Sequence, residues 1–307
     1  MRGWFLVSRR GTAGPGGLVV VDKPGGMTSH DVVARVRRLA GTRRVGHGGT
    51  LDPMATGVLV VGVERATRLL TYVVGHRKCY TATIRLGQST LTDDAQGELT
   101  GGADASAISE AAVRAGLEVL TGEIDQVPSA VSAIKVDGRR SYARVRAGEE
   151  VTLAPRRVTV YRLELGALRR PAPGLLDLDV EVECSSGTYV RALARDLGAA
   201  LGGVGGHLTA LRRTAVGGFS LAEARTLEEL AGLDDPVTLP LAAAVARLLP
   251  RRDADEEQAR TLAHGGALAP LGIDGPYGVF DPAGAVVAIV RERDGRARPD
   301  VVLAGGD

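Results

Sequence analysis

Cysteine and aromatic side chains are scarce in this sequence of 307 residues. Its two cysteines, Cys79 and Cys184, lack the spacing of a metal site and are too few for a disulfide scaffold, so we expect reduced thiols and a cytoplasmic protein. Aromatic residues make up only 3% of the chain, so Val, Leu and Ala must fill most of the core. The sequence has no run of about 18 apolar residues, and we therefore expect no membrane span.

A large net charge is also absent, but the basic residues are unevenly placed. The formal net charge is +2, yet residues 35–85 contain ten Lys or Arg and only two Asp or Glu. A second basic stretch covers residues 135–170. A basic surface on a nearly neutral protein suits a polyanionic partner. A solvated helix face with bound counterions would explain the basic residues equally well, and composition alone does not distinguish the two interpretations.

Turn signals and hydrophobic patterns divide the chain into three parts. Residues 1–16 have no convincing cleavage site and predict a flexible N-terminal extension rather than a signal peptide. Residues 17–250 mix strand-like apolar runs with helical patterns, which predicts one large α+β domain. In residues 251–307, Gly-Gly and Asp-Gly turns separate short Val-rich runs, which predicts a small β-rich module.

The same patterns place individual elements in the large domain. Its first helix should begin at Thr28 or Ser29, because either side chain can cap a helix. The predicted strands are 18–22, 58–63, 80–86, 158–165 and 176–184, and the further predicted helices are 66–74, 109–120, 189–201, 227–230 and 239–249.

Asp52 is the most informative residue of the chain. It lies in a glycine-rich stretch, residues 46–59, which reads GHGGTLDPMATGVL. Pro53 disfavours a helical backbone at Asp52, and nearby glycines allow close approach of a ligand. The carboxylate is therefore presented from a loop, where catalytic groups often lie. Taken alone, an Asp-Pro pair is more often only a turn.

This stretch resembles the signature of the bacterial tRNA pseudouridine-55 synthases, the TruB family, in which G-H-x-G-x-L-D-P carries the catalytic aspartate. The resemblance covers about residues 17–219 and continues more weakly to the C-terminus. It implies the pseudouridine synthase fold, with a mixed, largely antiparallel central sheet flanked by helices. It also implies that residues 251–307 form a PUA-like RNA-binding module.

The implied activity is the isomerisation of a T-loop uridine of tRNA to pseudouridine. The base is flipped out, its glycosidic bond is cleaved with the help of Asp52, and the base rotates and rebonds through a carbon. No electron or group enters or leaves, so no cofactor is needed. A carboxylate can act here as nucleophile or as base, and both roles stay open for Asp52.

The resemblance implies a base pocket around Asp52. Tyr80 should pack on the target base, Tyr189 should line the pocket, and Leu211 should close it. Arg191, in Gly-Thr-Tyr-Val-Arg, should pair with Asp52, since a carboxylate in a partly desolvated pocket needs a cationic partner. The two arginines after Leu211 should meet phosphate or acidic side chains of the protein itself.

Three further residues are implied at the substrate site. His47 should help to place the flipped RNA rather than act as acid or base, and Lys23 and Pro24 should support the Asp52 loop. The remaining histidines have no metal-ligand spacing, and no metal is expected. Lys23 and its glycines lack the G-K-[ST] of a phosphate loop, which argues against a nucleoside triphosphate site.

Residues 124–152 have little periodicity, and we expect a mobile, RNA-contacting insertion there. The stretch from Gln126 to Lys135 resembles the family segment Q-x-P-P-x-[YF]-S-A-[LI]-K, but Ser129 replaces a proline and Val131 replaces the aromatic residue.

The expected partner is the T-stem-loop of tRNA, bound by a monomer without a small-molecule cofactor. One alternative is an RNA-binding or RNA-folding protein without catalysis, which would not need Asp52, Tyr80 and Arg191 together. Another is an unrelated RNA enzyme. The zinc-deaminase signature H-x-E…C-x-x-C is missing, and the glycines of residues 202–206 follow a helix rather than a strand, which disfavours a dinucleotide loop.

Overall fold

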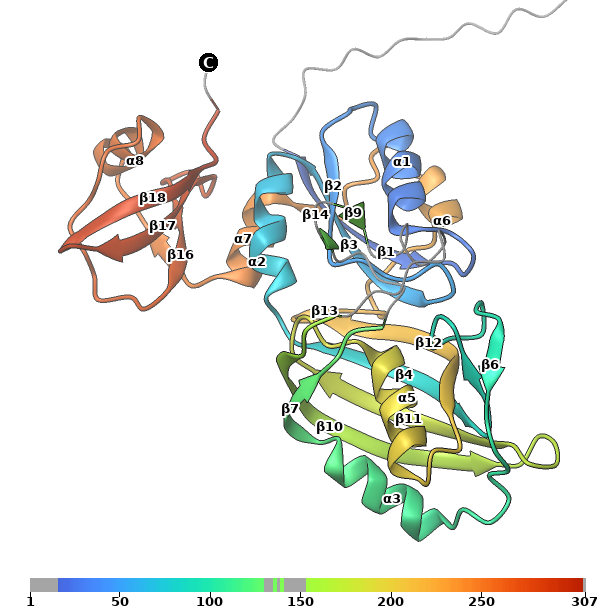
Figure 1. Cartoon of the computed structure of the whole chain (residues 1–307). Coiled ribbons are helices and arrows are strands. Elements are labelled where there is room, and N and C mark those ends of the chain that lie inside the picture. The colour runs from blue at the N-terminus through green and yellow to red at the C-terminus, as the bar shows by residue number, and fades with distance from the viewer. Residues whose placement is uncertain (1–15, 130–134, 137–138, 141–152, 306–307) are drawn as a thin grey trace, which may run out of the picture.

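The computed structural model describes residues 16–129, 135–136, 139–140 and 153–305. Within these residues a ten-stranded sheet organises a large domain, and a four-stranded sheet organises a smaller C-terminal module (Figure 1). The expected flexible extension falls outside the described residues, apart from Gly16, which begins strand β1.

The large sheet is mixed and largely antiparallel, as predicted. Its main path runs β14-β1-β3-β12-β4-β11-β10-β7, while β2 pairs with β3 and β13 pairs with β12. Among the described pairs of this sheet, only β3 and β12 run parallel. The bounds are β1 Gly16–Lys23, β2 Val45–Gly48, β3 Thr56–Glu64, β4 Lys78–Leu86, β7 Gly122–Gln126, β10 Arg156–Arg169, β11 Leu176–Cys184, β12 Gly206–Val216, β13 Phe219–Ser220 and β14 Leu239–Pro240.

Helices flank this sheet. In Figure 1, α5 lies across β4 and β12 with α3 beside β10, while α1, α2 and α6 surround the end of the sheet that holds β1, β2 and β3. Thr28 caps α1, and its hydroxyl accepts the N–H of Asp31 while Asp31 accepts the N–H of Thr28. The helices of the large domain are α1 Ser29–Leu39, η1 Arg65–Leu69, α2 Leu70–Val74, α3 Glu110–Val119, α5 Val190–Ala200, α6 Leu227–Ala231 and α7 Leu241–Leu248.

Two parts of the sheet differ from the sequence expectation. Residues 124–126 complete strand β7 at the sheet edge, so the expected insertion cannot begin before residue 127. Strand β12 was not predicted, because register shifts between Leu208 and Ala210 and between Arg213 and Ala215 interrupt the alternation of buried and exposed positions. Of the expected insertion beyond residue 129, the structure describes only the short pair β8 Lys135–Val136 and β9 Arg139–Arg140. The expected mobility and RNA contact lie outside the described residues.

The C-terminal module packs on the large domain. Phe280 and Leu303 belong to the same buried cluster as Leu18 and Leu69. Arg65, in η1, also donates to the carbonyl oxygen of Leu303 at 3.1 Å. The elements of the module are β15 Arg251–Asp253, α8 Glu256–Ala263, β16 Pro276–Phe280, β17 Val286–Arg293 and β18 Arg296–Val302. In the large domain, β5 Ser89–Thr90 and β6 Leu99–Gly101 form a separate hairpin. None of the helices in the described residues has both the length and the apolar character needed to cross a membrane.

Candidate active site

The loop between β2 and β3 holds Asp52 in a fixed turn. Ser29, the first residue of α1, accepts a hydrogen bond from the N–H of Leu51 at 2.9 Å and donates to the Leu51 carbonyl at 3.1 Å. The N–H of Ala55 donates to the Asp52 carbonyl at 3.1 Å, which closes the turn around Pro53. The Asp52 side chain remains 35% exposed. The backbone around Asp52 is therefore tied down while its carboxylate stays accessible.

Lys23 joins this turn to the end of β1. Its ammonium group donates to the carbonyl oxygens of Pro24 at 2.8 Å, Met27 at 2.7 Å and Pro53 at 3.3 Å. Burial lowers the pKa of Lys23 to about 8, although the nearby charge of Asp52 opposes this shift. These contacts use the three N–H groups of the ammonium to connect two turns. Lys23 and Pro24 thus lie behind the Asp52 loop rather than on the cavity wall described below.

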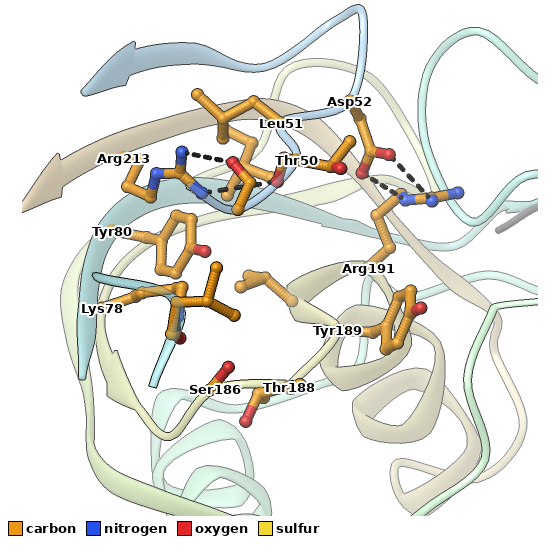
Figure 2. A pocket seen from close by; sticks show the side chains of 15 residues that line it. Thr50, Leu51, Asp52, Lys78, Tyr80, Ser186, Thr188, Tyr189, Arg191 and Arg213 are labelled. Atoms are coloured by element: carbon orange, nitrogen blue, oxygen red, sulfur yellow. Dashed lines mark hydrogen bonds and ion pairs between the residues drawn. The ribbon is translucent and has the colours of Figure 1, made fainter. Parts of the chain in front are cut away.

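Arg191, near the start of α5, lies directly against Asp52 (Figure 2). Its Nε donates to Oδ2 of Asp52 at 3.0 Å and its Nη2 donates to Oδ1 at 3.2 Å. Nη1 donates to the carbonyl oxygen of Thr92 at 2.6 Å and lies 3.6 Å from Oδ2 of Asp94. The Arg191 side chain is only 4% exposed. A buried guanidinium thus orients the accessible carboxylate through two parallel charged hydrogen bonds.

A cavity of about 240 Å³ opens beside this ion pair. Figure 2 shows Asp52, Tyr80, Tyr189 and Arg191 around it, and Leu211 also lies on its wall. Sites for drug-sized ligands usually measure about 300–1,000 Å³, so this cavity suits a single ring better than a larger ligand. The structure therefore brings together five of the eight residues that the sequence indicated.

Tyr80 supplies a flat, buried wall to this cavity. It lies in β4 and is 8% exposed. Burial raises the pKa of Tyr80 to about 12, although the adjacent Arg213 guanidinium opposes this shift. The phenol is consequently neutral near pH 7, where it can pack against a ring or donate a hydrogen bond but is a poor base.

Arg213 was expected to meet phosphate or an acidic side chain, and this prediction is wrong. Its guanidinium donates to the backbone carbonyl oxygens of Val58 at 2.7 Å, Gly49 at 3.0 Å and Thr50 at 3.4 Å. Gly49 and Thr50 lie in the loop between β2 and β3 and Val58 lies in β3, so one long cation with several N–H donors ties the loop to the strand that follows it. Arg213 therefore shapes the loop that presents Asp52.

Its neighbour Arg212 does meet an acid of the protein itself. It donates to both carboxylate oxygens of Asp22, at 2.7 and 3.1 Å. Arg212 and Arg213 are adjacent in a strand, so their side chains point to opposite faces of the sheet. This alternation explains why one arginine reaches the loop of Asp52 and the other does not.

Lys78 is a wall residue that the sequence did not indicate. Its ammonium donates to the carbonyl oxygens of Val74 at 2.9 Å, at the end of helix α2, and of His76 at 3.0 Å, just beyond it. Burial lowers the pKa of Lys78 to about 8. Strand periodicity could have found it, because Lys78 precedes Tyr80 by two residues and shares its face of β4.

His47 does not lie on the cavity wall. Its ring packs edge-on against His30 with the ring centroids 5.4 Å apart, and its Nδ1 has no hydrogen-bond partner within the described residues. Burial, followed by the charges of His30 and Arg213, lowers the pKa of His47. A neutral imidazole is therefore favoured at pH 7.

No group of three or more metal-ligating side chains is found within the described ranges.

The fold and this site define a pseudouridine synthase, and sequence comparisons are specific about the family. Residues 37–190 match the N-terminal domain of the TruB family pseudouridylate synthases. Residues 191–239 match the C-terminal domain of tRNA pseudouridylate synthase B, and residues 249–304 match the C-terminal domain of tRNA pseudouridine synthase II. The chain belongs to the TruB family of pseudouridine synthases.

Full-length relatives agree with the domain matches. A protein of Rhodococcus jostii named tRNA pseudouridine synthase B is 59% identical over 288 residues, which cover 94% of this chain and 93% of the relative. A protein of the same name from Thermobifida fusca is 58% identical over 292 residues, covering 94% of this chain and 99% of the relative.

Solved structures share the fold at lower identity. A chain in the crystal structure of a Cbf5-Nop10-Gar1 complex is 26% identical, with a TM-score of 0.69 over 94% of this chain and 85% of that chain. A chain in the structure of an H/ACA RNP bound to a substrate RNA containing 2'-deoxyuridine is 24% identical, with a TM-score of 0.68 over the same shares of the two chains. These likenesses extend the agreement in fold to proteins of distant sequence.

Proposed function

We propose that the chain is a tRNA pseudouridine-55 synthase, which isomerises one T-loop uridine of tRNA to pseudouridine. The observation that carries the proposal is the paired contact of Arg191 with Asp52 at the edge of a ring-sized cavity. Relatives that are more than half identical over nearly their whole length are named tRNA pseudouridine synthase B, which supports the same substrate class.

The reaction breaks the bond between N1 of the base and C1′ of the ribose and forms a bond between C5 and C1′. The hydrogen on C5 leaves as a proton and N1 gains one, so the product is an isomer. Asp52 either attacks C1′ or removes a sugar proton, and both routes need the ionised carboxylate that Arg191 stabilises. During rotation the detached base stays in the cavity, between the side chains of Tyr80 and Leu211.

The proposed partner is the T-stem-loop of tRNA, bound by a protein monomer in the cytoplasm, where tRNA is processed. The T-arm is a folded hairpin, so its shape and phosphates must supply most of the affinity, with one base extruded. The uneven basic charge of residues 35–85 supports a phosphate-contacting surface. Affinity should therefore fall steeply with salt concentration, and a flat salt dependence would contradict a phosphate-dominated interface.

The reaction is tested with an unmodified tRNA transcript that carries tritium at uridine C5. Forming the new C–C bond expels this hydrogen, so wild-type protein should release label to water from one T-loop uridine. Asp52→Asn should bind the tRNA and release nothing, and a transcript with cytidine at the mapped position should be inert. A folded wild-type protein that binds tRNA without releasing label would overturn the proposal and favour an RNA-binding protein without catalysis.

A further inference from the structure

The side chain of Gln126 holds the backbone of Tyr189 with both ends of its amide group. Its Oε1 accepts the N–H of Tyr189 at 2.8 Å, and its Nε2 donates to the Tyr189 carbonyl at 3.1 Å. Gln126 ends strand β7 and is only 2% exposed. One amide side chain therefore satisfies both peptide groups of a single residue, as a neighbouring strand would.

Tyr189 is the residue from which helix α5 begins. It has a backbone φ of −100° and ψ of 105°, and its side chain makes no capping hydrogen bond to the helix. Its carbonyl also accepts the N–H of Leu193 at 3.3 Å, the first hydrogen bond of the helix. Since Gln126 holds the peptide groups on both sides of the Tyr189 Cα, it fixes the direction in which α5 starts.

The start of α5 determines the position of Arg191. Arg191 follows Tyr189 by two residues, and its contacts to Asp52 are 3.0 and 3.2 Å long. Parallel charged hydrogen bonds depend on the plane and distance of both groups. A small rotation at Tyr189 would thus separate the guanidinium from the carboxylate and would also move a side chain on the cavity wall.

A second contact ties the end of β7 to the same helix. Nη2 of Arg195 donates to the carbonyl oxygen of Val127 at 2.7 Å. This contact lies one helical turn beyond Arg191 and leaves the peptide groups of Tyr189 untouched. Gln126 is therefore the contact that acts on the residues of the site, whereas Arg195 anchors the body of the helix.

We propose that Gln126 is a positioning residue for the isomerisation, acting through the backbone of Tyr189 to set Arg191 against Asp52. This inference rests on the proposed function. Gln126 affects the arrangement of the carboxylate and the cavity wall rather than the binding of the RNA backbone. Its loss should therefore lower the rate of the bound complex and leave the affinity for tRNA nearly unchanged.

The test compares Gln126→Leu with wild type in single-turnover tritium release and in tRNA binding. Misplacement of reacting groups by about 1 Å can cost 10²-fold in rate, so we expect kcat to fall by roughly 10- to 100-fold with KM within about twofold. Gln88→Leu is the matched control, because Gln88 is a half-buried glutamine in the turn between β4 and β5, does not line the cavity, and should leave both constants unchanged.

Gln126→Glu separates positioning from packing, since the two side chains have nearly the same shape. An ionised Glu can accept the Tyr189 N–H but cannot donate to the Tyr189 carbonyl, whereas a protonated Glu can do both. The ratio of the variant rate to the wild-type rate should therefore rise as the pH falls from 8 to 6. Gln126→Leu should show a constant ratio over the same range.

The outcomes distinguish this inference from the proposed function. If wild type releases no label, the proposed function fails. If wild type releases label and Gln126→Leu has the wild-type kcat, the inference is overturned, whether or not the melting temperature falls. A rise in KM at unchanged kcat would also overturn it, because it would place Gln126 in RNA binding.

Discussion

Arg191 and Asp52 are 139 residues apart in the sequence, yet the guanidinium of one lies edge to edge with the carboxylate of the other. Asp52 comes from the loop between β2 and β3, and Arg191 from the first turn of α5. The helix dipole disfavours a basic residue at the start of a helix. The ion pair with Asp52 therefore explains why an arginine occurs at this position. The site is thus assembled across the sheet rather than within one element.

Arg191→Lys should abolish most activity although the positive charge remains. A lysine is a point charge and cannot donate in parallel to both oxygens of Asp52 while also reaching Thr92. Losing one charged hydrogen bond costs about 1.5–3 kcal/mol, which corresponds to a rate loss of roughly 10- to 150-fold in single-turnover tritium release. Arg114→Lys, on the exposed face of α3, is the control and should have wild-type activity. Equal rates for Arg191→Lys and wild type would show that the paired geometry is unimportant.

Arg213→Met should lower both stability and activity, because three backbone carbonyls of the Asp52 loop and its flank lose their donor. Each buried acceptor left unsatisfied costs about 1–3 kcal/mol. The expected result is a lower denaturant midpoint together with a reduced kcat at temperatures where the variant is folded. Arg212→Met removes the neighbouring, partly exposed pair with Asp22 and should cost less than about 1 kcal/mol. Similar losses for the two variants would contradict the assigned role of Arg213.

Gly57→Ala should be among the most destabilising single-methyl substitutions near the site. Gly57 has a φ of +101°, and an added Cβ would lie 2.2 Å from the Arg213 carbonyl oxygen across the parallel pairing of β3 with β12. We expect a loss of more than about 2 kcal/mol in the free energy of unfolding, measured by urea titration. Gly75→Ala is the control, since Gly75 has a helical φ of −68° with no atom within 4 Å of its added Cβ. Gly75→Ala should leave the free energy of unfolding unchanged or raise it slightly. A Gly57→Ala protein as stable as wild type would contradict the close packing of Gly57 against the Arg213 carbonyl oxygen.

Local patterns predicted the regular elements and failed where the backbone is irregular. Strand β11 covers the predicted residues 176–184 because apolar and acidic residues alternate along it without interruption. Strand β12, next to the centre of the sheet, was missed because two register shifts break the same alternation. Helix α8 was also missed, since its eight residues bury only Leu262 and leave little apolar periodicity to detect.

The candidate site shows the same division between local and long-range information. Asp52 stood out because glycines and a proline surround it, and Arg191 was assigned through the family resemblance. Asp94 gave no local signal, since its contact with Arg191 depends on how the turn after β5 folds against the sheet. Gln126 looked like part of a loop until the structure placed it at the end of an edge strand.

Lys23 should make the stability of the protein depend on pH in the mildly alkaline range. Its folded pKa is about 8, below the ordinary value of 10.5, so the unfolded chain holds more protons between these pH values. The free energy of unfolding should therefore rise with pH there, by up to about 1.4 kcal/mol per pH unit for one such lysine. Lys78 adds a slope of the same sign, whereas Cys184, whose pKa burial raises from 9.0 to about 11, opposes it above pH 9.

The clearest window is thus pH 8 to 9, where urea titrations of wild type and Lys23→Met can be compared. Lys23→Met loses three hydrogen bonds and will be less stable throughout, so the informative quantity is the slope with pH. The variant should retain the part of the slope that Lys78 supplies and lose the rest. Gly75→Ala should keep the wild-type slope. If Lys23→Met also keeps the wild-type slope, Lys23 does not titrate between pH 8 and 9. The three carbonyl oxygens would then stabilise the buried ammonium by more than the loss of its hydration destabilises it.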